Sequence, residues 1–193
     1  MPLLELPVRT ERLVLRRFEA SDLKRFHAYQ SLPETARFLF RKELTLTQSM
    51  EALGRYANFT FDHEGDWVCL AIEHAGQPGL LGEVVLKWLP GTGQAEIGWI
   101  LAPESRGHGY AAEAAEAVLR LGFEKFAFHR IDAKLDALNT TSAAVCKRLG
   151  MRREAELIDT WHYKGQWSTE VIYAILDSEW RSRKPRQAKQ SNI

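Results

Sequence analysis

Cysteine is scarce in this chain of 193 residues, and its scarcity excludes several classes of fold. The two cysteines, Cys69 and Cys146, are too few for a disulfide framework. No CxxC motif or cluster of histidines suggests a zinc site. We therefore expect two free thiols in a reducing compartment and no bound metal.

Long apolar runs and an excess of one charge are also missing. No apolar run approaches the roughly 20 residues that a membrane-spanning helix needs, so no membrane association is expected. The first residues contain neither the basic nor the apolar segment of a signal peptide, and we expect a cytoplasmic protein. The formal net charge is +1, which argues against a specific nucleic-acid partner.

The rest of the composition is that of an ordinary globular domain, with 45% hydrophobic and 26% charged residues. A chain of this length can bury a core that needs no disulfides. We expect one domain over residues 1–180, followed by a basic, disordered tail over residues 181–193. The tail is expected to be solvated, and weak, salt-screened attraction to rRNA or an acidic partner is the alternative.

Hydrophobic periodicity predicts an alternation of strands and helices. A first strand is expected over residues 10–16, and a short helix after the capping signal Ser21-Asp22. Further helices are predicted over residues 47–61, 109–126 and 140–149, and strands over 66–73, 80–88, 95–101, 130–138, 153–161 and 167–176. Strand runs mixed with a few crossover helices favour an α/β (α+β) mixed sheet over a doubly wound parallel one.

The most informative segment joins the strand that ends at Leu101 to the helix that follows Gly109. Glycines at 107 and 109 let the backbone approach a ligand closely, and the first N–H groups of a helix lack internal partners. Together with the helix dipole they suit an anion such as a pyrophosphate, and Arg106 adds a positive charge. His108, between the glycines, is expected to point to solvent or toward a bound phosphate.

Two other interpretations of this segment compete. Gly107, Gly109 and Ala112 match the dinucleotide-binding pattern G-x-G-x-x-G/A. However, residues 103–106 separate them from the preceding strand, and Asp132 begins the next strand where the pattern needs an acidic residue at its end. The third interpretation is a glycine-rich loop that only caps a helix.

The segment Arg106-x-x-Gly109-x-Ala111 resembles the R/Q-x-x-G-x-G/A signature of the GNAT acetyltransferases, whose loop binds the pyrophosphate of coenzyme A. The resemblance extends over about residues 8 to 177. Three further segments, at 10–22, 139–151 and 163–173, resemble the branch that acetylates ribosomal-protein N-termini, the ribosomal-protein-alanine acetyltransferases. Glu170 stands where that branch usually has Asp.

The resemblance implies a fold, a co-substrate and a set of binding residues. The fold would be a mostly antiparallel twisted sheet of about seven strands, splayed between the fourth and fifth and flanked by about four helices. Acetyl-CoA would be the acetyl donor, with its pantetheine amides paired to the backbone of residues 99–101. The implied coenzyme contacts are Trp99, Ile100, Leu101, Arg106, Gly107, His108, Gly109, Tyr110, Ala111, Asn139 and Ser142. An ordinary helix cap is the alternative role for Asn139.

Two residues are the candidates for catalysis. Glu96 shares a strand face with Gly98 and is predicted to act as a base through water, with an ion pair as the alternative. Glu113 is a second carboxylate, whose position helix stability explains equally well. Ser142 is predicted to assist the departing thiolate, because Cys146 stands where many GNAT enzymes have a tyrosine. An acyl-carrying Cys146 lacks a neighbouring histidine to activate it.

We therefore expect direct acetyl transfer from acetyl-CoA to a primary amine in a ternary complex, with the α-amine of a protein N-terminus as acceptor. A small amine such as an amino acid, a polyamine or an aminoglycoside is the enzymatic alternative, and an acetyl-CoA sensor without turnover is the other. The acceptor would be chosen by residues 31–45 and the last hairpin. Aromatic residues of that hairpin are interpreted as core and homodimer packing, with an acceptor pocket as the alternative: Trp161, His162, Tyr163 and Trp167.

Overall fold

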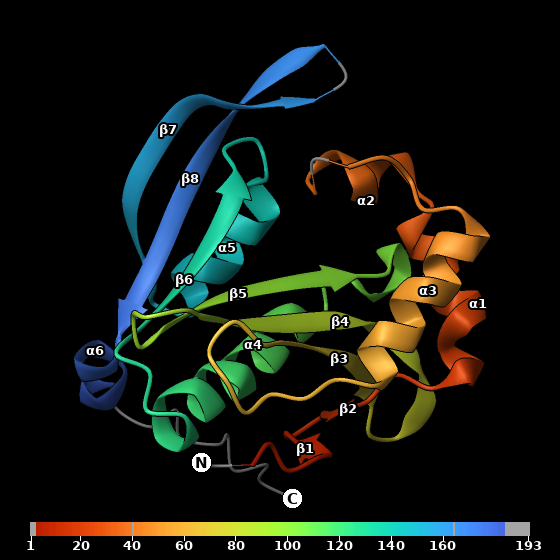
Figure 1. Cartoon of the computed structure of the whole chain (residues 1–193), viewed down its shortest axis with the longest axis horizontal. Helices are drawn as coiled ribbons and strands as arrows, with labels where there is room; N and C mark the ends of the chain where they lie inside the picture. Colours follow the sequence, from red (N-terminus) through yellow and green to blue (C-terminus); the bar gives the residue numbers. More distant parts are fainter. Residues whose placement is uncertain (1–2, 40, 164, 184–193) are drawn as a thin grey trace, which may run out of the picture.

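The computed structural model describes residues 3–39, 41–163 and 165–183. Its strands form one eight-stranded sheet in the order β1-β2-β3-β4-β5-β6-β8-β7 (Figure 1). Neighbouring strands are antiparallel except β5 and β6. The strands are β1 (Val8–Arg9), β2 (Leu13–Arg16), β3 (Trp67–His74), β4 (Gln77–Leu89), β5 (Gln94–Leu101), β6 (Arg130–Asp136), β7 (Arg152–Tyr163) and β8 (Gln166–Leu176).

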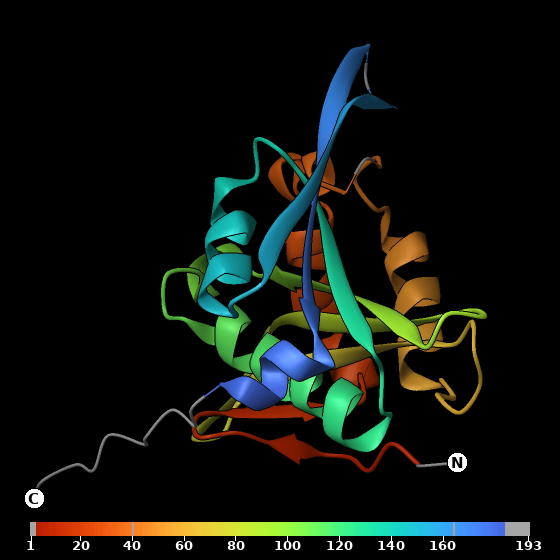
Figure 2. The same ribbon diagram turned by 90° about the vertical axis from the view of Figure 1, so that its left-hand side faces the viewer.

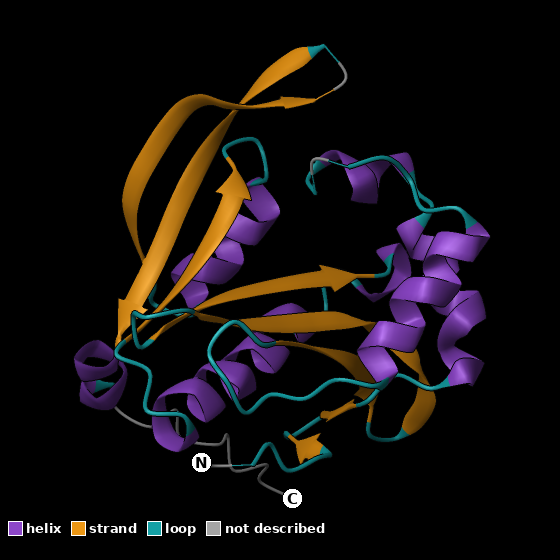
Figure 3. Cartoon of the chain, viewed as in Figure 1, coloured by secondary structure: helices purple, strands orange, loops and turns teal. Residues whose placement is uncertain are grey.

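Helices cover both faces of this sheet, as Figure 3 shows by colour. α1 and α3 pack on one face, while α4 and α5 lie on the other (Figures 1 and 2). The helices are α1 (Leu23–Gln30), α2 (Pro33–Arg37), α3 (Leu46–Ala57), α4 (Tyr110–Arg120), α5 (Thr140–Arg148) and α6 (Asp177–Ser182). The mixed α/β fold predicted from the sequence is thereby confirmed.

Two cores follow from this layering. The larger one packs the α4 face of the sheet against Val118 and Leu119, and the smaller one packs Phe26 and Leu53 of α1 and α3 against the opposite face. Strand β3 supplies both cores, and residues 68–72 are all buried. A strand covered on both faces reads as a continuous apolar run, which is why this segment shows no polar alternation.

The feature that prepares a binding site is the separation of β5 from β6. Their ladder joins residues 94–96 only to residues 130–132. Beyond Glu96, β5 still pairs with β4 as far as Leu101, and β6 with β8 as far as Asp136. The splayed strands that the family resemblance implied are present, and the second half of β5 lies along an opening in the sheet.

The glycine signals of the sequence mark helix ends. Gly109 is the N-cap of α4 with φ +82°, and Gly150 follows α5 with φ +68°. Past α5, the amide of Met151 donates to the carbonyl of Cys146, which closes the helix in a left-handed turn. The helix predicted over residues 109–126 consists of α4 and a π-helical turn over residues 121–125.

Several predicted boundaries were wrong. The strand expected over residues 10–16 begins only at Leu13, because residues 10–12 form the turn between the antiparallel strands β1 and β2, where Thr10 and the Arg12 backbone amide donate to Glu113. The short helices α2 and α6 were not predicted, since five or six residues are too few to show helical periodicity.

Helix α6 extends past residue 180, where the predicted domain ends. Arg181 lies in α6, where its guanidinium donates to Asp177, so the tail does not begin at residue 181. The tail predicted over residues 184–193 lies outside the described residues. In the described part of the chain, no helix is long and apolar enough to cross a membrane.

Candidate functional site

A pocket of about 490 Å³ lies where β5 and β6 separate. Its walls come from the second half of β5, the glycine loop at 106–109, β6, α5 and α2. Most of the predicted coenzyme residues line it: Trp99, Ile100, Leu101, Arg106, Gly107, Gly109, Ala111, Asn139 and Ser142. Segments about 40 residues apart in the sequence therefore meet in one cavity, as the family resemblance implied.

His108 and Tyr110 lie outside this wall. Their rings stack on each other with centroids 5.5 Å apart, and the Arg12 guanidinium lies 5.0 Å from the centre of the Tyr110 ring. His74 contacts the same Tyr110 ring from β3. Their side chains therefore pack around Tyr110, and contact of either residue with the coenzyme stays a prediction.

The glycine loop is open, and guanidinium groups lie around it, two of them paired with carboxylates: Arg12 with Glu113 and Arg106 with Glu34. Gly107 and Gly109 both have φ +82°, a conformation that favours glycine. A Cβ atom at Gly107 would meet nothing within 4 Å, whereas one at Gly109 would lie 3.5 Å from Arg148 Nη1 and 3.6 Å from Arg12 Nη2. With Arg106, three guanidinium groups surround the loop, a charge that suits a polyphosphate.

Sequence reasoning missed the roles of Arg12 and Arg148. Nothing in the local pattern placed either residue at the loop, because Arg12 is about 100 residues away and Arg148 is the last residue of α5, about 40 residues after the loop. Arg148 lines the pocket itself. Arg12 reaches the loop backbone, where its Nη1 donates to the carbonyl of His108 at 3.2 Å.

Glu113 in the first turn of α4 anchors this loop to β2. Its Oε1 accepts from Thr10 Oγ1 at 2.6 Å and from the Arg12 amide at 2.8 Å, and its Oε2 accepts from Arg12 Nε at 2.8 Å. Partial burial acts to raise the pKa of Glu113, but the hydrogen bonds from Thr10 and Arg12 outweigh it and lower the pKa below its ordinary value. Glu113 is thus used in structural contacts.

Asn139 and Ser142 lie side by side at the start of α5. Asn139 Oδ1 accepts from the Ser142 backbone amide at 3.0 Å, the N-cap arrangement anticipated as the alternative role for Asn139. Both residues also line the pocket, so capping and ligand contact are compatible. The cap orients the first turn of α5 toward the opening beside β5.

Glu96 and Cys146 have surroundings that bear on their predicted chemistry. Glu96 Oε2 accepts from Lys134 Nζ at 2.9 Å and lies outside the pocket wall, so the ion pair anticipated as the alternative is present. A role for Glu96 as base stays a prediction. Cys146 is fully buried, and burial raises the pKa of its thiol to about 12. It is therefore a packing residue that remains protonated at neutral pH.

Glu83 is a buried carboxyl group that sequence reasoning missed. It lies on β4 opposite Ile100, and its Oε2 accepts from Tyr29 Oη at 2.7 Å and from Gln30 Nε2 at 2.9 Å. Burial raises the pKa of Glu83 to about 7, although both hydrogen bonds act to lower it. A lone Glu inside the apolar run 80–86 was the available signal.

The last hairpin extends away from the body of the domain (Figure 2). Trp161 and Trp167 are 46% and 62% exposed, so the interpretation of these two residues as core was wrong. Trp161 Nε1 donates to Glu170 Oε2 at 2.7 Å, and the rings of His162 and Trp167 lie 4.9 Å apart. The Tyr163 side chain is outside the described part of the structure.

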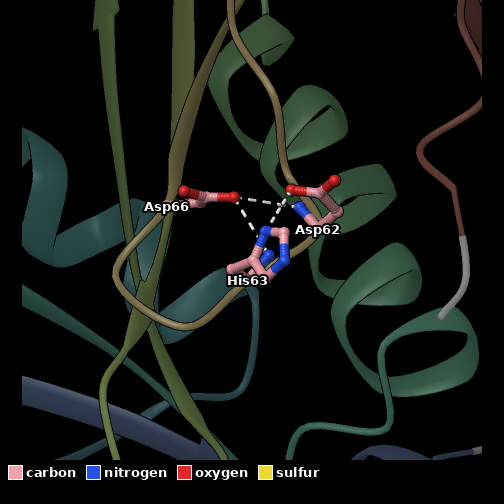
Figure 4. A group of neighbouring side chains, drawn as sticks. All are labelled: Asp62, His63 and Asp66. Atoms are coloured by element: carbon pink, nitrogen blue, oxygen red, sulfur yellow. Dashed lines mark hydrogen bonds and ion pairs between the residues drawn. The ribbon is translucent and has the colours of Figure 1, made fainter.

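One group of possible metal ligands occurs in the turn before β3, away from the pocket wall (Figure 4). His63 Nδ1 lies 2.7 Å from Asp62 Oδ1, and Asp66 Oδ2 accepts from the backbone amides of Asp62 and His63 at 3.0 Å each. These hydrogen bonds close the turn that leads into β3. They explain the grouping without a bound ion.

Comparison with known proteins agrees with this geometry. Residues 12–152 match the family described as the acetyltransferase (GNAT) domain. An uncharacterized N-acetyltransferase of Bacillus subtilis, YnaD, is 32% identical over 173 residues, which are 90% of this chain and 98% of that protein. YdaF of the same species, a putative ribosomal N-acetyltransferase, is 30% identical over 91 residues, 47% of this chain and 50% of its own.

A solved structure has the same fold. The crystal structure of a GNAT-family acetyltransferase from Bacillus anthracis superposes with a TM-score of 0.81 and 30% sequence identity. The match covers 90% of this chain and all of the other. The overall fold is therefore shared with a solved acetyltransferase over nearly the whole chain.

Proposed function

The chain belongs to the GNAT family of acetyltransferases, and on this premise we propose that it transfers the acetyl group of acetyl-CoA to the α-amine of a protein N-terminus. The observation that carries the proposal is the single pocket that joins the open edge of β5, the glycine loop and the start of α5. These are the three contacts that a phosphorylated, amide-containing thioester requires.

The coenzyme would be held mainly by backbone groups. The free amides at the start of α4, the two glycines and Arg106 suit the pyrophosphate, and Arg148 adds charge beside it. Residues 99–101 would pair with the pantetheine amides as an added strand does. Asn139 lies at the end of β6, where it would reach the same arm.

The reaction needs a neutral amine, a polarised carbonyl and a stabilised leaving group. A backbone N–H near Ile100 would stabilise the oxyanion that forms when the amine attacks the thioester carbon. The C–S bond then breaks, and the Ser142 hydroxyl would donate a hydrogen bond to the departing thiolate. Glu96, acting through water, remains our candidate for removing the proton from the amine.

Two observations support a protein N-terminus as acceptor. The segments at 10–22, 139–151 and 163–173 resemble the ribosomal-protein branch, and YdaF, which is 30% identical over about half of its length, is described as a putative ribosomal N-acetyltransferase. A small amine remains the enzymatic alternative, and an acetyl-CoA sensor the non-enzymatic one. We place the protein in the cytoplasm, where acetyl-CoA is available, and a homodimer remains a proposal.

An acetylation screen separates these alternatives. The purified protein is incubated with acetyl-CoA and with peptides that have free N-termini, the same peptides with blocked N-termini, spermidine or free amino acids. Mass spectrometry should find acetyl groups on the free N-termini alone. Acetylation of spermidine but not of any peptide would favour the small-amine alternative, and binding of acetyl-CoA without any product would favour the sensor.

A further inference from the structure

Helix α2 forms the wall of the pocket that faces the glycine loop. Glu34, Thr35, Phe38 and Leu39, in and just after this helix, line the cavity. In Figure 1, α2 lies across the gap from the β7–β8 hairpin, beyond the end of β5. The wall combines a carboxylate, a hydroxyl group and two apolar side chains.

Thr35 carries an independent sign of a missing ligand. The residue is buried, with a relative exposure of 5%, and it belongs to the pocket lining. Its Oγ1 has no hydrogen-bond partner in the described part of the chain. Buried hydroxyls in proteins are normally paired, so this unpaired hydroxyl, on a residue that lines the cavity, is available to a polar group of a ligand once the Thr35 side chain turns toward the cavity.

An ion pair connects this wall to the glycine loop. Arg106 Nη1 lies 2.9 Å from Glu34 Oε1, and Arg106 Nε donates to the carbonyl of Leu101 at 3.2 Å. The guanidinium group therefore joins the end of β5 to α2. The Arg106 and Glu34 side chains are 42% and 57% exposed, so the ion pair is weakened by solvent and is easily exchanged.

We propose that Glu34 changes partner during the reaction cycle, from Arg106 in the free protein to the ammonium group of the acceptor in the ternary complex. The inference rests on the proposed function. A pyrophosphate carries more negative charge than one carboxylate and attracts a guanidinium group more strongly, so the bound coenzyme draws Arg106 toward the loop. Glu34 is then an unpaired carboxylate in the pocket wall.

The rest of the wall defines the acceptor class. The Glu34 carboxylate would accept a hydrogen bond from the ammonium group of the acceptor, and the Thr35 hydroxyl would accept a second one. Phe38 and Leu39 would contact an apolar group next to that ammonium. The geometry fits an amine that arrives protonated with an apolar group adjacent to it. Glu34 and Thr35 are specificity-determining residues in this assignment, and the proton leaves the amine after it has bound.

The test compares Glu34→Gln with Glu104→Gln. Glu104 lies two residues from Arg106 and forms a similar exposed ion pair with Arg25 at 3.1 Å, but it does not line the pocket. Titration calorimetry with CoA alone should show about two- to fivefold tighter binding for Glu34→Gln, because no carboxylate competes for Arg106. Glu104→Gln should bind CoA like the wild type.

Steady-state kinetics test the second partner of Glu34. With saturating acetyl-CoA and the peptide that turns over best, Glu34→Gln should raise the acceptor KM about tenfold with little change in kcat, whereas Glu104→Gln should change neither. The acetylated product has no ammonium group, so its inhibition constant should be the same in both variants and the wild type.

The outcomes are distinct. An unchanged acceptor KM in Glu34→Gln, or an equal loss of product affinity, would overturn the assignment of Glu34 to the ammonium. Weaker binding of CoA by Glu34→Gln would overturn the exchange with Arg106. If the wild type acetylates no amine, the proposed function fails and the inference fails with it. If the wild type acetylates the peptide and Glu34→Gln has the same kcat and acceptor KM, the inference alone is refuted.

Discussion

Glu83 makes the stability of this protein depend on pH in an unusual direction. Burial raises the pKa of this carboxyl group from the ordinary 4.5 to about 7, although Tyr29, Gln30 and the charge of Arg41 act to lower it. Between about pH 4.5 and 7, the unfolded chain has released this proton while the folded chain keeps it. The folded state then binds more protons, so the contribution of Glu83 to stability falls as pH rises through this window.

The size of the effect follows from the two pKa values. Their difference corresponds to roughly 3 kcal/mol of lost stability, most of it between pH 5 and 8. Glu83→Gln removes the charge and keeps an oxygen that can accept from Tyr29 and Gln30. The free energy of unfolding of the variant, relative to the wild type, should therefore rise by roughly 2–3 kcal/mol over this pH range.

Urea denaturation of both proteins at pH 5, 6, 7 and 8 measures this difference, and contributions from all other titrating groups cancel in it. The corresponding difference in melting temperature should grow by about 5–10 °C for a domain of this size. A difference that stays flat from pH 5 to 8, or a variant that loses stability relative to the wild type as pH rises, would refute the assignment of a raised pKa to Glu83.

Three further predictions concern the pocket. Gly109→Val should weaken acetyl-CoA binding at least about tenfold in calorimetry without unfolding the domain, because valine at φ +82° is strained and its methyl groups would displace Arg148, while Gly54→Ala, in α3 with open space around it, should bind normally. Ser142→Ala should lower kcat about tenfold to a hundredfold with a small change in the acetyl-CoA KM, and Cys146→Ala should keep the wild-type kcat. An inactive Cys146→Ala enzyme beside a fully active Ser142→Ala enzyme would reopen an acyl-cysteine route. Glu113→Gln should raise the acetyl-CoA KM about threefold to tenfold at unchanged kcat, since it loosens the loop from Thr10 and Arg12, and an unchanged KM would contradict the anchoring role.

The parts of the fold that could be predicted from the sequence are those encoded by local pattern. Helix α5 was predicted to within one residue, because Asn139 caps its start and Gly150 follows its end. Helix α2 was missed, because its five residues begin at Pro33 and rely on contacts with the rest of the domain. The turn between β1 and β2 was missed for a related reason, since it is held by hydrogen bonds to Glu113, about 100 residues later.

The two halves of the pocket, the proposed coenzyme site and the proposed acceptor wall, also differ in how much the local sequence reveals. The proposed coenzyme contacts use the backbone of one short segment, so glycine spacing and one arginine were enough to predict them from the sequence. The proposed acceptor wall consists of side chains in and just after α2, and the sequence gives no sign of it, because only the fold brings Glu34 to 2.9 Å from Arg106. Arg106 therefore belongs to both halves. Its spacing from the glycines is part of the sequence motif, and its ion pair with Glu34 links the proposed acceptor wall to coenzyme binding. In this chain the motif predicts the acetyl donor from the sequence alone, whereas the proposed acceptor contacts are recognised only from the ion pair of Glu34 with Arg106.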